Sequence, residues 1–125
     1  MKKSDNNVVS LFEQTNQGVQ KAVLTDSMKM KRGGSLSNPI VAYETWGKLS
    51  KQKDNVVVIL TGLSASSHVA SHSNNSKPGW WEGIVGPDKA IDTNKFYVIC
   101  VNSLGSCFGS TGPASINQIT CEPFR

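Results

Sequence analysis

Two short segments of the sequence approximate the G-x-S-x-G turn that presents a catalytic nucleophile. Residues 62–66 (GLSAS) depart from this pattern only at the last position, where Ser66 stands in place of glycine. Residues 105–109 (GSCFG) fit the pattern with Cys107 in the position of the serine. Such a turn joins a strand to a helix and exposes the nucleophile at the end of the strand, ready for covalent catalysis.

The residues around Cys107 do not support a reactive thiol. The apolar run before it ends near Val101, several residues early, and the turn-forming residues 110–113 (STGP) follow it. A helix N-terminus at this point would be needed to lower the pKa of the thiol. We therefore do not assign Cys107 as a nucleophile. Ser66 is small enough for the other turn, so the residues alone leave Ser64 open as an alternative.

The two histidines, His68 and His72, are four residues apart. On a helix they would share a face, as two ligands of one metal ion do. However, the sequence has no H-E-x-x-H pattern, and no nearby cysteine or aspartate completes a ligand set. We interpret both as surface or loop histidines and predict no metal site.

An aromatic-rich loop is predicted at residues 77–87 (KPGWWEGIVGP), where Trp80 and Trp81 stand between Gly and Pro turn signals. These side chains, with Trp46, have the size and shape to stack on a coenzyme or line a substrate tunnel. The alternative, which we favour for each tryptophan alone, is that they fill the junction between loop and sheet. Asn102 and Ser110 are polar residues suited to capping loops.

Two apolar runs predict the strands that position these residues. Val56–Leu60 and residues 96–101 are rich in β-branched side chains, as are parallel strands buried on both faces. The intervening positions 61–95 allow a right-handed crossover with a helix, best placed at residues 64–71. Residues 21–31 and 40–45, around Gly33-Gly34, predict an antiparallel hairpin. The expected fold class is α/β.

Charge and composition exclude several functions. The 125 residues carry a net charge of +4, but the basic residues are scattered and form no cluster with aromatics, so we predict no nucleic-acid partner. The longest apolar run is too short to span a membrane, and no apolar segment follows Lys2 and Lys3, which excludes a normal signal peptide. The cysteine count is odd, with no C-x-x-C pair, and indicates the reducing cytoplasm. Residues 1–20 are polar and are interpreted as a flexible lead-in.

Three segments in the order 42–47 (AYETWG), 77–87 and 101–113 (VNSLGSCFGSTGP) resemble the homoserine O-acetyltransferase family, a branch of the α/β-hydrolases. The resemblance runs from about Gly33 to about Phe124. It implies that residues 21–125 form a partial domain, the amino-terminal part of an α/β-hydrolase sheet with a hairpin and two parallel central strands. An α/β-hydrolase domain is about twice as long as this chain or more.

The resemblance implies an enzyme that moves an acetyl group from acetyl-CoA to the hydroxyl of homoserine in methionine biosynthesis. Acetyl-CoA would be a substrate, with no bound cofactor, and the complete enzyme would be a homodimer. Succinyl transfer and serine as the acceptor are alternatives within the family. A non-catalytic remnant or interaction module is the alternative from a different class.

The site residues that the resemblance implies are few. Leu63 matches the family residue whose N–H contributes to the oxyanion hole, although Thr61 stands where the family has His, and Ser64-Ala65 where it has Thr-Gly. His68 matches a histidine after this turn, for which a hydrogen-bonding role is expected. Trp80, Trp81 and Asn102 are candidate site-lining residues. The family's catalytic serine, aspartate and histidine match no position here, so we expect the chain alone to be inactive.

Overall fold

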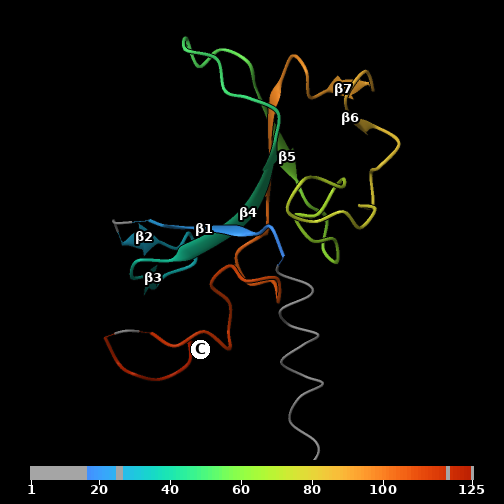
Figure 1. Ribbon diagram of the computed structural model, residues 1–125. Helices are drawn as coiled ribbons and strands as arrows, with labels where there is room; N and C mark the ends of the chain where they lie inside the picture. Colours follow the sequence, from blue (N-terminus) through green and yellow to red (C-terminus); the bar gives the residue numbers. More distant parts are fainter. Residues whose placement is uncertain (1–16, 25–26, 118, 125) are drawn as a thin grey trace, which may run out of the picture.

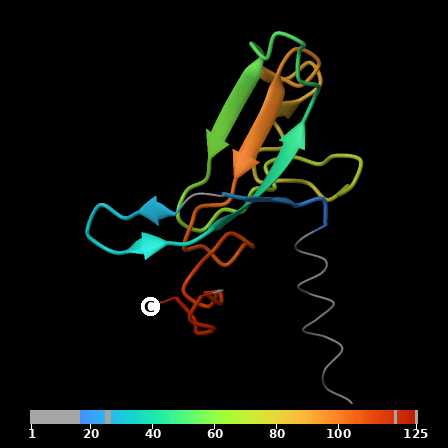
Figure 2. The ribbon, with the colours of Figure 1, turned by 90° about the vertical axis from the view of Figure 1, so that its left-hand side faces the viewer.

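A computed structural model describes residues 17–24, 27–117 and 119–124 (Figure 1). Its main sheet has four strands in the order β1-β4-β8-β5, formed by Gln20–Val23, Ile40–Trp46, Tyr97–Val101 and Val56–Leu60, respectively. Strand β8 runs antiparallel to β4 and parallel to β5. In Figure 2, β5 (green) and β8 (orange) point the same way beside the opposed β4. The two parallel strands predicted from the apolar runs are confirmed, with β8 inside the sheet and β5 at its edge.

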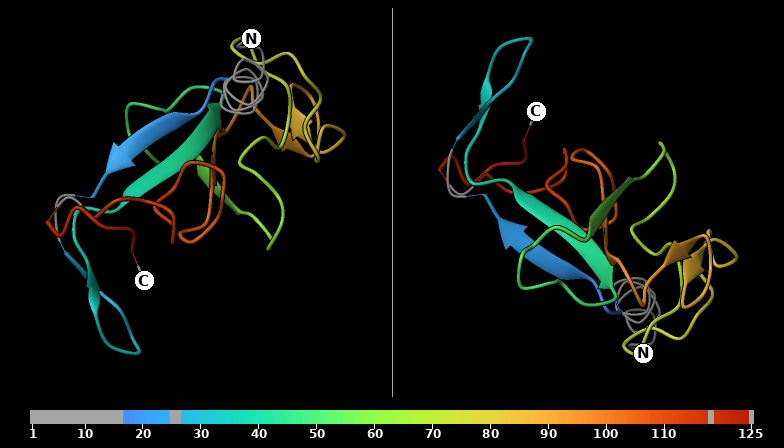
Figure 3. Two further views of the ribbon diagram at one scale, coloured as in Figure 1. Left: turned by 90° about the horizontal axis from the view of Figure 1, so that it is seen from below. Right: turned by 90° about the horizontal axis from the view of Figure 1, so that it is seen from above.

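The hairpin is confirmed with one refinement, because its first arm is divided into two strands. β1 pairs antiparallel with β4, and between them β2 (Met28–Lys29) pairs with β3 (Ser35–Leu36). Gly33 and Gly34 have φ of 97° and 79°, values that favour glycine, and they close the turn between β2 and β3. Figure 3 shows this outer hairpin projecting from one end of the sheet.

The hydrophobic core lies on one face of the sheet. Trp46, Ile59, Val98 and Cys100 point to this face from three strands and meet the connection between β5 and β8, which contributes Val69, Ala70 and Val85. The expected burial of β5 on both faces is wrong. Val58 and Leu60 on its second face are 57% and 79% exposed, because nothing in the described part of the chain covers them and β5 is the edge strand.

The predicted helix at residues 64–71 is also wrong: these residues form bends and irregular backbone. The backbone groups that a helix would pair internally are bonded elsewhere, since Ser66 O accepts a hydrogen bond from Trp80 Nε1 and the Ser71 N–H donates to Glu82 Oε2. The same connection contains the short parallel pair β6 (Val85–Gly86) and β7 (Ile91–Asp92). The crossover is therefore made by loops that cover the core face.

The remaining expectations about the chain have mixed outcomes. Residues 1–16 of the predicted lead-in lie outside the described residues, whereas Gln17 O accepts a hydrogen bond from Asn75 Nδ2 and Gln20 begins β1. No helix long and apolar enough to cross a membrane occurs in the described ranges. Cys100, Cys107 and Cys121 are free thiols, and the cytoplasmic location stays a prediction.

Candidate functional site

The loops that follow β5 and β8 meet at one edge of the sheet. Because the two strands are parallel, their carboxyl ends at Leu60 and Val101 are neighbours, the position where α/β folds bind ligands. Thr61 Oγ1 donates a hydrogen bond to Val101 O at 3.3 Å and lies 3.3 Å from Ser103 Oγ. The first residues of the two loops are thus joined directly.

Leu63 lies three positions beyond the end of β5, on a turn whose residues 62–64 are all exposed. Its side chain is fully exposed, and within the described part of the chain its N–H has no hydrogen-bond acceptor. A free backbone N–H in this place has the chemistry needed to bind an oxyanion. Its assignment to the oxyanion hole stays a prediction, as does the site-lining role of Trp80 and Trp81.

The far end of this turn is fixed by polar contacts. Trp80 Nε1 donates to Ser66 O at 2.9 Å, and Ser67 N–H donates to Asn102 Oδ1 at 2.7 Å. Asn102 Nδ2 also donates to Ser67 Oγ at 2.9 Å and to Phe108 O at 3.0 Å. Asn102 is buried, so it links the two loops, while Ser110 Oγ donates to the Asn102 carbonyl at 2.7 Å. These contacts agree with the loop-capping roles expected for Asn102 and Ser110.

The three tryptophans divide between the core and the surface. Trp46 is buried and its Nε1 donates to Ala70 O and Ser71 O, both at 3.2 Å. Trp80 and Trp81 remain 43% and 41% exposed, with ring centroids 5.2 Å apart. Filling the junction between loop and sheet therefore describes Trp46 well, whereas the tryptophan pair keeps exposed aromatic surface.

Neither approximate nucleophile turn is completed by a base. The ring nitrogens of His68 and His72 bond to Glu44, to Lys77 O and to the Asn74 N–H, and to neither Ser64 nor Cys107. The exposed Cys107 lines an open cavity of about 400 Å³ with residues of the loop 105–115. No helix follows either turn in the described part of the chain, so the activation described for such nucleophiles is not formed there.

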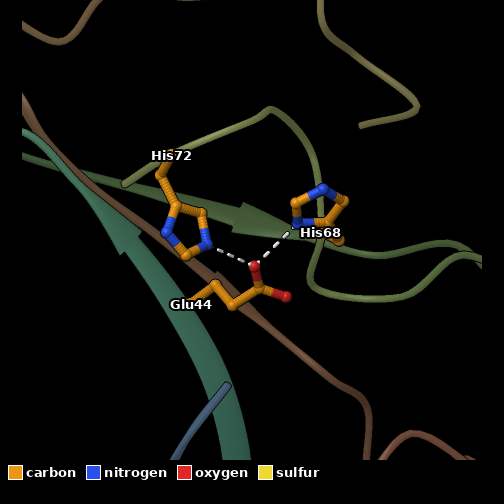
Figure 4. Close-up of side chains that lie close together, drawn as sticks. All are labelled: Glu44, His68 and His72. Atoms are coloured by element: carbon orange, nitrogen blue, oxygen red, sulfur yellow. Dashed lines mark hydrogen bonds and ion pairs between the residues drawn. The ribbon is translucent and has the colours of Figure 1, made fainter. Parts of the chain in front are cut away.

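A buried carboxylate joins the two histidines (Figure 4). Glu44 Oε2 lies 2.8 Å from His68 Nδ1 and 2.8 Å from His72 Nε2, and Glu44 Oε1 accepts a hydrogen bond from Ser67 Oγ at 2.8 Å. Glu44 is only 1% exposed because alternation along β4 places it on the core face, between Ala42 and Trp46. The sequence analysis missed this residue. The available signal was an acidic residue on the apolar face of a strand, which requires a partner.

A second carboxylate holds the tryptophan loop. Glu82 accepts hydrogen bonds from Gly79 N–H, Ser71 Oγ and Ser71 N–H, at 2.9, 2.8 and 2.7 Å, and Lys89 Nζ lies 3.7 Å away. These contacts, led by the Gly79 N–H, lower the pKa of Glu82 to about 2. On β8, burial and then the charge of Glu44 raise the pKa of Cys100 to about 12, so this thiol stays protonated.

Comparison with known proteins finds O-acyltransferases and an esterase that are similar to this chain in sequence or structure. No protein-family model matches the chain. It is 56% identical over 102 residues to the serine O-succinyltransferase of Litchfieldella anticariensis, covering 82% of this chain, and 60% identical over 103 residues to that of Frateuria aurantia. Homoserine O-acetyltransferase from Bacillus anthracis has a similar structure, with a TM-score of 0.71 and 34% identity over 84% of this chain and 30% of that one.

An esterase is similar at a TM-score of 0.69 and 38% identity, covering 84% of this chain and 31% of the esterase. The chain spans 28% of the length of the two serine O-succinyltransferases. The three motifs, the mixed sheet and these relatives confirm the resemblance: the chain carries the amino-terminal part of the α/β-hydrolase fold found in the homoserine O-acetyltransferase family.

Proposed function

We propose that this chain supplies the oxyanion loop and a neighbouring wall of an O-acyltransferase site that acts on the hydroxyl of homoserine or serine. The observation that carries the proposal is the edge formed by the parallel strands β5 and β8, where the N–H of Leu63, on an exposed turn, has no acceptor among the described residues. The names of the relatives support the acyl-transfer chemistry.

The proposed reaction proceeds through an acyl-enzyme. A serine attacks the thioester carbonyl of an acyl-CoA, and the amino-acid hydroxyl then attacks the acyl-enzyme with a histidine as base. In both steps the carbonyl oxygen becomes negatively charged, and the Leu63 N–H would donate a hydrogen bond to it. The serine, aspartate and histidine match no position of this chain, so residues outside it would supply them.

Two combinations of acyl donor and acceptor follow from the relatives. The motifs imply acetyl-CoA and homoserine, in agreement with the structural similarity to homoserine O-acetyltransferase. Succinyl transfer to serine is the second candidate, because relatives that are 53% to 60% identical carry the name serine O-succinyltransferase. We propose that the complete enzyme is a homodimer and that its substrates are small molecules only.

A chimeric enzyme tests the proposal. This chain replaces the matching segment of the Frateuria aurantia serine O-succinyltransferase, and CoA release is measured with each donor and acceptor pair. Leu63→Pro removes the N–H, so kcat is expected to fall about 100- to 1,000-fold, as for other oxyanion donors. Leu63→Ala keeps the N–H and is the matched control, with activity near that of the parent chimera.

Three outcomes distinguish the proposed acyltransferase site from its alternatives. Equal activity of Leu63→Pro and the parent chimera would remove Leu63 from the oxyanion hole. A folded chimera that is inactive with every donor and acceptor would favour the non-catalytic interaction module instead. The chain by itself, assayed with acetyl-CoA and homoserine, is expected to match a blank without protein, because oxyanion donors alone leave only weak catalysis.

A further inference from the structure

The hydrogen bonds of His68 require protons on both of its ring nitrogens. Nε2 lies 2.8 Å from Lys77 O, and a backbone carbonyl only accepts, so Nε2 must carry a hydrogen. Nδ1 lies 2.8 Å from Glu44 Oε2. If Glu44 is ionised, Oε2 is also an acceptor only, and Nδ1 must be a donor. A histidine that donates from both nitrogens is an imidazolium cation.

The surroundings of Glu44 favour its ionised form. Ser67 Oγ accepts from Asn102 Nδ2, so its own hydrogen goes to Glu44 Oε1. His72 Nδ1 accepts the Asn74 N–H at 3.3 Å, which places the hydrogen of a neutral His72 on Nε2, directed at Glu44 Oε2. Two donors, Ser67 Oγ and His72 Nε2, thus converge on one carboxylate before His68 is considered. Hydrogen bonds of this kind stabilise the anion, so the proton between Glu44 and His68 belongs to the histidine.

Within the described cluster, no other charged group contacts Glu44 or His68. His72 is accounted for as a neutral donor, Lys77 contributes only its carbonyl oxygen, and Cys100 on the neighbouring strand is a protonated thiol. Asn75 Nδ2, at 3.5 Å from His68 Nδ1, is too distant to compete with the 2.8 Å contact. One anion and one cation therefore face each other, and each needs the other in order to remain buried.

A metal ion explains the same three side chains less well. The ligand atoms of Glu44, His68 and His72 lie within 4.8 Å of one another, and two histidines with a carboxylate are a ligand set that Zn²⁺ accepts. Bonds of ~2.1 Å in a tetrahedral site would separate neighbouring ligand atoms by ~3.3 Å. The observed separations of 2.8 Å from Glu44 Oε2 to both nitrogens are those of hydrogen bonds.

The pair holds one end of the oxyanion turn against the sheet. Glu44 stands on β4, which has a strand on each side, and it holds both Ser67 and its neighbour His68. At the other end, Thr61 is joined to the end of β8. The exposed residues 62–64 therefore span two fixed points, and the direction of the Leu63 N–H depends on both.

We propose that buried Glu44 and partly buried His68 form an ion pair that positions the loop 61–67, with both acting as positioning residues. Only the catalytic consequence of this pair rests on the proposed function; the pair itself does not.

Nitrogen NMR of the ¹⁵N-labelled chimera at pH 7, in which the rest of the fold is present, tests the pair without any assay of activity. We expect both ring nitrogens of His68 to be protonated, whereas His72 shows one protonated nitrogen, Nε2, and one bare nitrogen. A His68 with a single ring hydrogen would overturn the proposal, and so would two histidines that both give the averaged signals of free imidazole.

Glu44→Gln removes the anion while keeping the shape of the side chain. His68 is expected to lose one ring hydrogen, because a partly buried cation would be left without its anion. The Ser67 N–H is expected to exchange with solvent about tenfold faster or more, the size of effect that loss of a charged hydrogen bond produces. Glu82→Gln, a carboxylate-to-amide change in the same connection, is the matched control and should alter neither signal.

Two results would contradict the positioning role. One is a Ser67 exchange rate that is the same in Glu44→Gln and Glu82→Gln. The other is displacement of the histidine ring hydrogens by one equivalent of Zn²⁺, with Co²⁺ giving the visible absorption of a tetrahedral site, since the cluster would then be a metal centre. If the NMR result holds and Leu63→Pro leaves chimera activity unchanged, the ion pair stands and only the proposed function fails.

Discussion

At the scale of single residues, the polar interior is built from side chains that each make several hydrogen bonds. Glu44, Ser67 and Asn102 are buried and bridge β4, the loop after β5 and the loop after β8. In the described ranges, no buried side-chain nitrogen or oxygen lacks a partner. Leaving one of these groups without its partner costs about 1–3 kcal/mol, so each substitution affects the rest of the network.

Glu82 gives a prediction about pH at this scale. Its pKa is lowered from 4.5 to about 2 by the Gly79 and Ser71 donors, so the ionised form binds better in the folded state. The stabilisation is therefore fully present above pH 4.5 and is lost as the pH falls toward 2. We expect the melting-temperature difference between the parent chimera and its Glu82→Gln variant to shrink across this window.

Circular dichroism melts at several pH values measure that difference. The pKa of Asp92 is also lowered, chiefly by the Asn94 N–H, so melts of the parent chimera alone would report more than Glu82. Subtracting the Glu82→Gln melts isolates Glu82. A difference that stays constant from pH 6 to pH 2 would show that the contacts of Glu82 do not stabilise the fold.

At the scale of elements, the connection between β5 and β8 depends on a close approach of two loop segments. A Cβ added at Gly79 would lie 2.1 to 2.3 Å from the backbone atoms of Val69 and Ala70. The same approach allows the Trp81 N–H to donate to Val69 O at 2.8 Å. Glycine at this position thus allows the two loop segments to pack closely, and these loops cover the core where a helix was predicted.

Gly79→Ala is expected to destabilise the chain by about 1–3 kcal/mol or more, because backbone atoms rather than a flexible side chain must move. Gly83→Ala is the control in the same loop, since nothing lies within 4 Å of the added Cβ. Urea unfolding of both variants, made in the chimera, measures the two free energies of unfolding. Equal values would mean that the close contact of Gly79 with residues 69–70 is not maintained in solution.

At the scale of the whole molecule, the sheet is covered on one face and has an exposed edge. Val58 and Leu60 lie on the uncovered face of β5, and β5 pairs only with β8 among the described strands. An uncharged, β-branched edge is a template for pairing with other chains. Each large apolar side chain left in water forgoes about 1.5–3 kcal/mol, against a typical net stability of about 5–15 kcal/mol.

We expect the isolated chain to self-associate or to lack fixed tertiary packing. Sedimentation and the near-ultraviolet circular dichroism of Trp46, Trp80 and Trp81 test this. Val58→Lys with Leu60→Lys should reduce association because charge blocks edge pairing, whereas Ile59→Lys, at a buried position, should unfold the core. A monodisperse monomer with sharp aromatic signals and cooperative melting would show that the chain folds as an independent domain.

The sequence by itself determined the features that depend on local patterns. The β-branched runs predicted β5 and β8, Gly33-Gly34 predicted the hairpin, and three motifs in order predicted the family resemblance. Each of these signals is contained within a short segment, and strand and turn preferences act over the same short distance. The helix predicted at residues 64–71 failed because distant partners, the Trp80 ring and Glu82, bond the Ser66 carbonyl and the Ser71 N–H that the helix would pair.

Only the tertiary structure decided the buried polar cluster and the uncovered face of β5. Glu44 is far from His68 and His72 in the sequence, and their pairing arises because β4 and the crossover loop face the same core. The alternation along β4 places Glu44 inward, but which donors surround it depends on the path of the loop. Burial makes a partner obligatory for a charge, and the fold selects which partner it finds.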